Sequence, residues 1–187
     1  MNTSIKRELV KKALKSYYAG GFQAVGMDRL AKETGISKTS MYKHFRKKED
    51  LILEVLALRD EQFRNWFIRR IEEMANTPIE RLSAIFDVLG EWFQEEGFLS
   101  CIFIRASSEY LSHENPIHMA SVKHKRLLLT YVIGIAEQAG TKNPGKLARQ
   151  LMLLVEGAIV LAHLNGPENI SNNAKSAADV LIKAALK

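Results

Sequence analysis

The chain has 187 residues, of which 47% are apolar and 26% are charged, which excludes a disordered chain, a collagen-like fibre and a disulfide-stapled mini-protein. The formal net charge is +6, and residues 1–50 contain 12 Lys and Arg against 5 Asp and Glu, whereas the other 137 residues contain 15 against 16. This asymmetry predicts an anionic partner for the first 50 residues, nucleic acid before an acidic membrane surface.

Three features bear on the compartment. Cys101 is the one cysteine in the sequence, so neither an internal disulfide nor a Cys-x-x-Cys zinc site is expected. The first residues have no apolar core of a secretory signal. The longest apolar stretch, Leu151 to Leu164, is interrupted by Glu156 and His163 and is shorter than the roughly 20 residues that span a bilayer. We therefore expect a cytoplasmic protein that does not enter a membrane.

Apolar residues recur every three or four positions in nearly every segment, and no segment alternates as a strand would, so we predict an all-α fold. A first amphipathic helix runs from Ile5 to the Gly20-Gly21 pair, and two short helices follow at 28–34 and 38–44. A helix of about 26 residues over 49–74 comes next, long enough to belong to two domains.

A capping residue followed by proline predicts the start of each of three later helices. Thr77-Pro78 with Glu80 predicts a capping box, and Asn115-Pro116 and Asn143-Pro144 repeat the cap-then-proline pattern. Helices are therefore expected to begin near 78, 116 and 144, with a last helix over about 174–186. We divide the chain into a basic three-helix domain, 1–47, and a larger, near-neutral helical domain, 48–187.

The stretch 28–47 has the spacing of a helix-turn-helix. Ala31 allows close approach of two helices, Gly35 permits a left-handed turn, and Met41 fills the angle between them, while Ser37 is placed to cap the second helix. An ordinary helical turn with a solvated face shares this spacing, but the local positive charge favours DNA binding. The outward residues are suited to base edges and phosphates: Lys38, Thr39, Ser40, Tyr42, Lys43 and His44.

Three segments then carry a resemblance: Tyr-Ala-Gly-Gly-Phe at 18–22, Leu-Ala-Lys-Glu-Thr-Gly-Ile-Ser-Lys at 30–38, and Tyr-Lys-His-Phe-Arg-Lys-Lys-Glu-Asp-Leu at 42–51. Over residues 5–55 the chain resembles the DNA-binding domain of the tetracycline-repressor (TetR) family. The resemblance implies a homodimeric repressor that binds a palindromic operator and leaves the DNA when the C-terminal domain, which also dimerises, binds a small molecule.

The resemblance also implies roles by position. Lys38, Thr39 and Ser40 would face bases, Tyr42 and His44 would contact phosphate or sugar, and Lys48 would anchor the DNA backbone at the start of the long helix. One departure is Val25-Gly26-Met27, where the family usually has Ser or Thr before the second helix. The hydroxyl that would cap this helix and contact a phosphate is therefore absent, and Gly26 caps only through its backbone.

In the helical body, few charges interrupt 147–163 and the last helix, so these helices either form a plain core or meet a second copy in a four-helix interface. We favour the interface, with these residues: Leu151, Leu154, Val155, Ala158, Ile159, Ala162, Val180 and Leu181. Candidates for a small-molecule pocket, which we expect to take a hydrophobic effector, are mostly aromatic or Met: Trp66, Phe86, Trp92, Phe93, Phe103, Tyr110, Met119, Tyr131, Met152 and Glu156.

No metal and no cofactor are expected. His113, His118 and His124 are five and six residues apart, which does not align ligands on one helical face. We interpret Cys101 as a buried, inert thiol, with a redox sensor as the alternative. Two alternatives to a ligand-released repressor stay open: a DNA-binding regulator controlled by a protein partner, and, remotely, an all-helical enzyme, against which no phosphate loop or nucleophile grouping is found.

Overall fold

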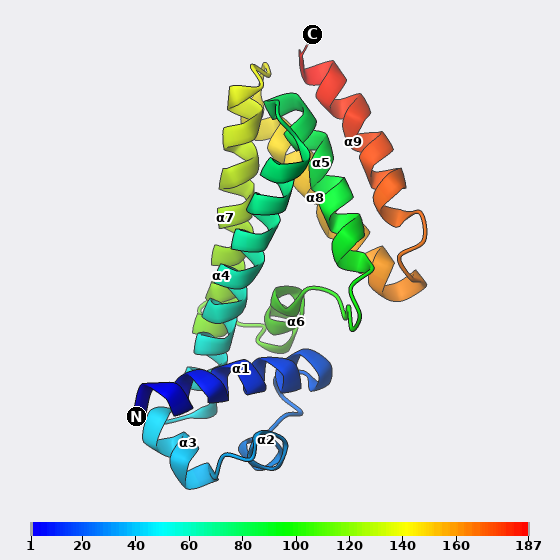
Figure 1. Ribbon diagram of the computed structural model, residues 1–187. Coiled ribbons are helices and arrows are strands. Elements are labelled where there is room, and N and C mark those ends of the chain that lie inside the picture. The colour runs from blue at the N-terminus through cyan, green and yellow to red at the C-terminus, as the bar shows by residue number, and fades with distance from the viewer. Residues whose placement is uncertain (1, 187) are drawn as a thin grey trace. The chain divides into compact units, whose positions relative to one another are not determined.

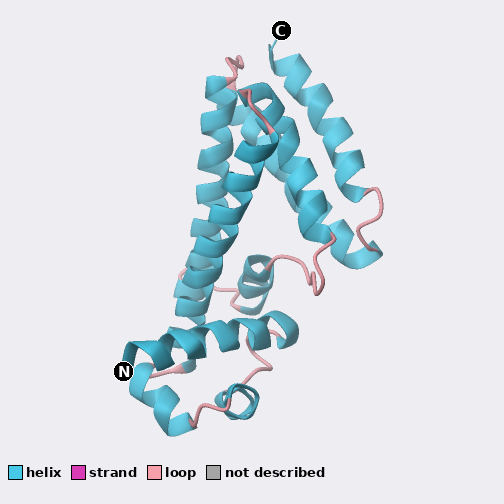
Figure 2. Cartoon of the chain, viewed as in Figure 1, coloured by secondary structure: helices cyan, strands magenta, loops and turns pink. Residues whose placement is uncertain are grey.

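The computed structural model describes residues 2–186, and within that range it contains nine α-helices and no strand (Figure 1, Figure 2). The all-α prediction is confirmed. The helices are α1 (Asn2–Gly20), α2 (Met27–Thr34), α3 (Lys38–His44), α4 (Lys48–Met74), α5 (Pro78–Phe93), α6 (Ile102–Glu109), α7 (Pro116–Gln138), α8 (Pro144–Asn165) and α9 (Ile170–Leu186).

The predicted capping box at the start of α5 is present. The Glu80 backbone N–H donates to the Thr77 hydroxyl (3.3 Å), and the Thr77 N–H donates to the Glu80 carboxylate (3.0 Å). These reciprocal bonds satisfy two of the donors that a helix leaves open at its first turn. They also lower the pKa of the Glu80 carboxyl, with the backbone N–H of Thr77 as the largest cause.

The other two helix starts that the cap-then-proline pattern predicts are also confirmed. Asn143 Oδ1 accepts from the Lys146 N–H (3.0 Å) at the start of α8, and Asn115 Oδ1 accepts from the Ile117 N–H (2.8 Å) at the start of α7. Two features differ from expectation. Helix α9 begins at Ile170, four residues before the predicted start, and α6 was not predicted as a separate helix because Cys101, its N-cap residue, makes no side-chain capping bond.

The described chain packs as two units. Unit 1 holds the residues up to Phe63 together with Cys101–His124, and unit 2 holds Arg64–Ser100 together with the residues from Lys125 onward. Helices α4 and α7 each continue from one unit into the other. These packing units do not follow the division at residue 47, because α6 and the start of α7 pack with the first helices. A functional boundary at 47 stays a prediction.

In unit 2, α5, α8 and α9 lie side by side (Figure 1). Two short polar contacts join α9 to α5: the Ser83 hydroxyl donates to Asp179 (2.6 Å), and Lys175 Nζ donates to Asp87 (2.6 Å). Few side chains of α9 are buried, so these contacts fix its position together with close backbone packing against α5.

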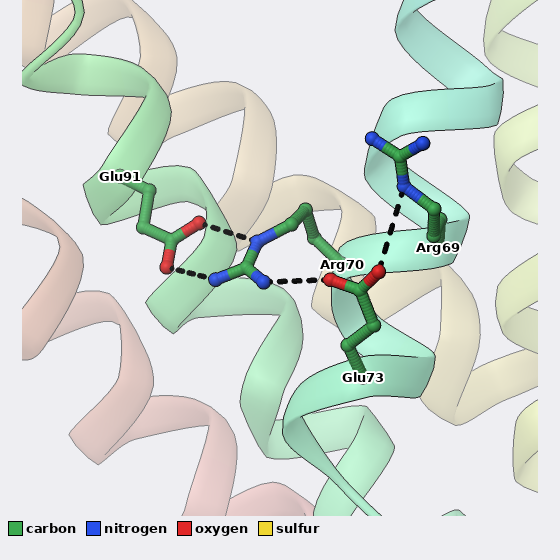
Figure 3. A network of polar contacts seen from close by, with 4 residues as sticks. All are labelled: Arg69, Arg70, Glu73 and Glu91. Carbon is green, nitrogen blue, oxygen red and sulfur yellow. Dashed lines mark hydrogen bonds and ion pairs between the residues drawn. The ribbon is translucent and has the colours of Figure 1, made fainter.

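An arginine also joins the C-terminal half of α4 to α5 within unit 2 (Figure 3). Arg70 donates two hydrogen bonds to the Glu91 carboxylate (3.0 and 2.7 Å) and one to Glu73 (2.7 Å), while Arg69 pairs with Glu73 at 3.6 Å. The bidentate geometry matches the planar guanidinium to the carboxylate. It raises the pKa of Arg70 and lowers that of Glu91.

Helix α8 is, by length and composition, apolar enough to cross a membrane, contrary to the expectation from the sequence. The core helix of a soluble protein meets the same criterion. Seven side chains of α8, from Leu147 to Ala162, are buried by unit 2 itself.

Candidate nucleic-acid interface

The predicted turn between α2 and α3 has the expected geometry. Gly35 has φ +71°, in the left-handed region, and its N–H donates to the Ala31 carbonyl (3.1 Å), which ends α2. The Ser37 hydroxyl accepts from the Ser40 N–H (3.2 Å) and so caps α3, while Met41 is fully buried. The helix-turn-helix is confirmed.

Gly26 caps α2 through its backbone alone, as predicted. Its φ of −85° and ψ of 171° are extended, and it makes no side-chain capping bond. A Cβ built on Gly26 meets no atom within 4 Å. The residue therefore needs neither the backbone freedom nor the small size of glycine.

Most of the predicted DNA contacts lie on the surface of α3. Lys38, Thr39, Tyr42 and Lys43 are exposed, whereas Ser40 and His44 are half-buried. Thr39 and Lys43 form no hydrogen bond or ion pair with another described residue, which leaves both side chains available to a ligand.

Lys38 is different, because it already has an acidic partner. Its Nζ lies 2.8 Å from an Asp28 carboxylate oxygen at the start of α2, and both side chains are well exposed. The hydrogen bond to Asp28 and, second, the negative charge of Asp28 raise the pKa of Lys38. A DNA phosphate or base at this position would compete with Asp28.

Lys48, the first residue of α4, is half-buried, and its Nζ donates to the Gln23 carbonyl (3.2 Å) in the connector between α1 and α2. Helix α1 is tied to the motif in a similar way: Lys12 Nζ donates to the Thr34 carbonyl (2.8 Å) at the end of α2. Lys6 pairs with Glu54 of α4 (2.7 Å). Several lysines near the motif thus bind partners within the protein, a role that charge counting does not reveal.

The comparisons with known proteins agree with this geometry. Residues 9–55 match the family described as "Bacterial regulatory proteins, tetR family". The crystal structure of SCO4454, a TetR-family transcriptional regulator from Streptomyces coelicolor, is similar over 98% of this chain and 97% of that chain, with a TM-score of 0.91 and 26% identity. Residues 9–55 thus form a DNA-binding domain of the TetR family.

Two curated relatives carry the same kind of description. The HTH-type transcriptional regulator YjdC of Escherichia coli is 19% identical over 180 residues, which is 96% of this chain and 94% of YjdC. The HTH-type transcriptional repressor KstR2 of Mycolicibacterium smegmatis is 33% identical over 86 residues, 44% of this chain and 40% of KstR2. Together these matches support a TetR-family, DNA-binding transcriptional regulator, and the enzyme alternative is dropped.

The candidate pocket residues belong to both packing units. Phe103, Tyr110 and Met119 belong to unit 1, where Met119 is exposed (56%). The other seven belong to unit 2: Trp66, Phe86, Trp92, Phe93, Tyr131, Met152 and Glu156. Of these, Phe86, Trp92 and Phe93 are buried, and the rest are half-buried. A pocket lined by these residues stays a prediction.

Five of the candidate interface residues need a correction. Leu151, Val155, Ala158, Ile159 and Ala162 are buried inside unit 2, so they form core, the alternative that the sequence left open. Leu154 and Leu181 are half-buried, and Val180 is exposed (67%). The apolar residues that α8 does expose were missed, because a helix that is apolar nearly all round does not show which face turns inward.

The remaining candidates lie outside the helix-turn-helix segment of the sequence, on or next to α6 and α7. His124 is buried, its Nδ1 is 2.7 Å from Asp60 Oδ1, and its ring stacks on Phe103. His118 Nδ1 lies 2.9 Å from the Tyr110 carbonyl. Cys101 is buried, as expected.

Proposed function

We propose that the protein is a homodimeric repressor that binds a palindromic operator through α3 and Lys48 and leaves it when a hydrophobic small molecule binds to the C-terminal body. The name of the relative KstR2 supports the repressor assignment. The observation that carries the operator site is the exposed row of α3, in which Thr39 and Lys43 have no partner among the described residues while Ser37 and Met41 fix the helix beneath them.

The division of labour on this surface follows from chemistry. Hydrogen bonds from short hydroxyl side chains to base edges carry sequence information, whereas lysines on phosphates add affinity without it. Thr39 and Ser40 are therefore the residues that we assign to base reading. We assign Lys43, Lys48, Tyr42 and His44 to contacts with the phosphate backbone. Lys38 contributes to DNA binding only where its ion pair with Asp28 is broken.

A dimer is supported by an apolar stripe on α8. Leu153, Val160, Leu161 and Leu164 are exposed by 74%, 39%, 46% and 69%, at a spacing that places them on one face. Gly157 lies on the same face and is also exposed, and a Cβ built there meets no atom within 4 Å. An exposed apolar helix face of this kind marks an interaction site, and a two-fold dimer would pair it with itself. We call these five residues the α8 stripe.

An effector site in unit 2 is supported by a buried hydroxyl group that lacks a hydrogen-bond partner. The Tyr131 hydroxyl is buried and has no hydrogen-bond partner among the described residues. Such a group costs about 1–3 kcal/mol, and a polar atom of a ligand would remove that cost. Lys125 Nζ donates to both Glu156 oxygens (2.7 and 2.8 Å), so this pair needs no charged ligand. We therefore expect a largely apolar effector with one polar group near Tyr131.

The experiment starts from selection of bound sequences from a random duplex library of about 30 base pairs, enough for two half-sites one helical turn apart. Enrichment of a palindrome, bound more tightly than random duplex at physiological salt and with a steep salt dependence, is expected. Equal affinity for the enriched and random duplexes would refute operator binding. Release of the enriched duplex is then tested with a long-chain fatty acid and with a hydrophobic quaternary ammonium salt. Failure of both, with the duplex still bound, favours a protein partner.

A further inference from the structure

The connector between α1 and α2 is held by α6, a helix that contributes nothing to the helix-turn-helix itself. The Gln23 backbone N–H donates to the Glu109 carboxylate (2.6 Å), and the Gln23 side-chain amide donates to the Glu109 carbonyl (3.4 Å). Both residues belong to unit 1 and are 86 positions apart in the sequence. A hydrogen bond to an ionised carboxylate is among the stronger kinds.

Two neighbouring contacts strengthen this attachment. Arg105 Nη1 donates to the Tyr18 carbonyl (2.7 Å), one of the carbonyls that the last turn of α1 leaves without a helical partner. Gly21 has φ +82°, and a Cβ there would lie 2.8 Å from Glu109 Oε1. The glycine therefore serves both the turn and the close approach of the carboxylate.

The same connector residue is bound on its other side by a predicted DNA contact. Lys48 Nζ donates to the Gln23 carbonyl (3.2 Å), so the N–H of Gln23 is fixed by α6 and its C=O by the start of α4. The connector leads directly into α2, which precedes the turn and α3. A shift of residue 23 would therefore move Lys48 and the start of α2 relative to each other.

We propose that Glu109, assisted by Arg105, is a positioning residue for sequence-specific DNA binding. It fixes the α1–α2 connector and thereby the position of Lys48 relative to the helix-turn-helix. The inference rests on the operator binding proposed above. Glu109 is an acid, so it does not bind a DNA phosphate. If it acted only through its negative charge, it would repel DNA, and removing the charge would strengthen binding to every duplex. A positioning role predicts weaker binding instead.

The test compares three variants of the full chain on two DNAs, the duplex enriched by selection and a random duplex. Glu109→Ala removes the acceptor, Glu109→Gln removes the charge but keeps an acceptor oxygen, and Glu109→Asp keeps the charge but draws the carboxylate back by one methylene. We expect Glu109→Ala and Glu109→Asp to bind the enriched duplex about tenfold more weakly, the effect of losing one charge-assisted hydrogen bond. Glu109→Gln should stay within about threefold of the wild type.

Binding to random duplex should not weaken in any of the three. Glu114→Gln is the matched control, because Glu114 is exposed, near in sequence and forms no hydrogen bond or ion pair with another described residue; it should behave as the wild type. The folded fraction is followed by circular dichroism at the assay temperature, and Glu109→Asp, the smallest change, decides if Glu109→Ala is partly unfolded.

Equal effects of the Ala and Gln variants, no effect of the Asp variant, or parallel losses on both DNAs would overturn the positioning role. If selection enriches no sequence from the wild type, it is the proposed operator binding that fails. If the wild type discriminates and Glu109→Ala discriminates equally well, only the present inference fails.

Discussion

Gly90 of α5 and Ser171 of α9 pack so closely that a Cβ at residue 90 would lie 2.8 Å from the Ser171 Oγ and 3.3 Å from its Cβ. The hydroxyl could rotate away, but the Ser171 Cβ moves only with the backbone of α9. This contact belongs to the same α5–α9 pairing as the ion pair of Asp87 with Lys175 and the hydrogen bond of Ser83 with Asp179. Close packing at Gly90 therefore sets the distance between the two helices.

The first prediction compares two helical glycines. Gly134 of α7 has no atom within 4 Å of a built Cβ, so Gly134→Ala should raise the free energy of unfolding by about 1 kcal/mol through helix propensity. Gly90→Ala has the same propensity gain but must displace Ser171, and should be neutral or destabilising. Urea unfolding of both variants measures the difference.

A double variant checks the cause. Adding Ser171→Ala to Gly90→Ala removes the nearer of the two atoms and should recover part of the stability. An equal gain from both glycine substitutions would show that α9 yields to a Cβ without cost, contrary to the packing described.

The sequence was sufficient for the helices whose ends carry their own chemistry. Thr77, Asn115 and Asn143 each bond to a backbone N–H within three residues, so the signal and the structure are equally local. The helix-turn-helix was found for the same reason, since Gly35 and Ser37 act on their immediate neighbours.

The sequence was insufficient where partners are far apart along the chain. No spacing rule links Glu109 to Gln23, or marks Lys48 and Lys12 as lysines that bind carbonyls within the protein. The interface candidates failed for a related reason. Leu151 and Leu153 are the same residue type, but Leu151 is 0% exposed and Leu153 is 74% exposed. Only the positions of α5 and α9 decide which of the two is buried.

The second prediction concerns the glycines that flank α2. Gly35→Ala should lower the free energy of unfolding by about 1 kcal/mol, because an L-residue is strained at φ +71° even though the added Cβ has open space. Gly26→Ser should raise it by about 0.5 kcal/mol, because the backbone is extended and the hydroxyl can cap α2. Thermal unfolding by calorimetry measures both. Gly35→Asn is the control, since Asn tolerates the left-handed region better, and a loss as large as that of Gly35→Ala would argue against strain.

The third prediction separates reading of bases from binding of phosphates. Thr39→Ala should change the sequence enriched by selection while leaving the salt slope of binding unchanged. Lys43→Ala should weaken all duplexes alike and lower the salt slope by about one. Both side chains lie on the exposed side of α3, and the helix is capped independently by Ser37, so neither change should unfold it. A sequence preference altered by Lys43→Ala alone would reverse the assignment.

The fourth prediction uses the pH dependence of the Arg70–Glu91 pair in Figure 3. The pKa of Glu91 is lowered in the folded protein, so the stability from this pair is fully present above the ordinary carboxyl pKa of 4.5 and is lost as the pH falls through the lowered value. Arg70→Gln should therefore lower the Tm near neutral pH, and the difference from the wild type should shrink below pH about 4. Arg70 is half-buried and Glu91 is exposed, so a small effect is expected. Glu95→Gln, an exposed change outside any described ion pair, should show no such pH-dependent difference.

The fifth prediction tests the α8 stripe as a dimer interface. A buried charge at an apolar interface is costly unless it is paired, so Leu153→Glu and Leu164→Glu should each give a monomer in sedimentation equilibrium while the helical circular dichroism is retained. Leu111→Glu is the matched control, because Leu111 is equally exposed (77%) but belongs to unit 1.

Leu151→Ala acts differently: it truncates a buried core side chain and should cost about 2–5 kcal/mol of stability. A dimer that survives both Glu substitutions in α8 would place the interface elsewhere, and operator affinity measured on the same samples shows whether loss of the dimer also weakens binding to the palindrome.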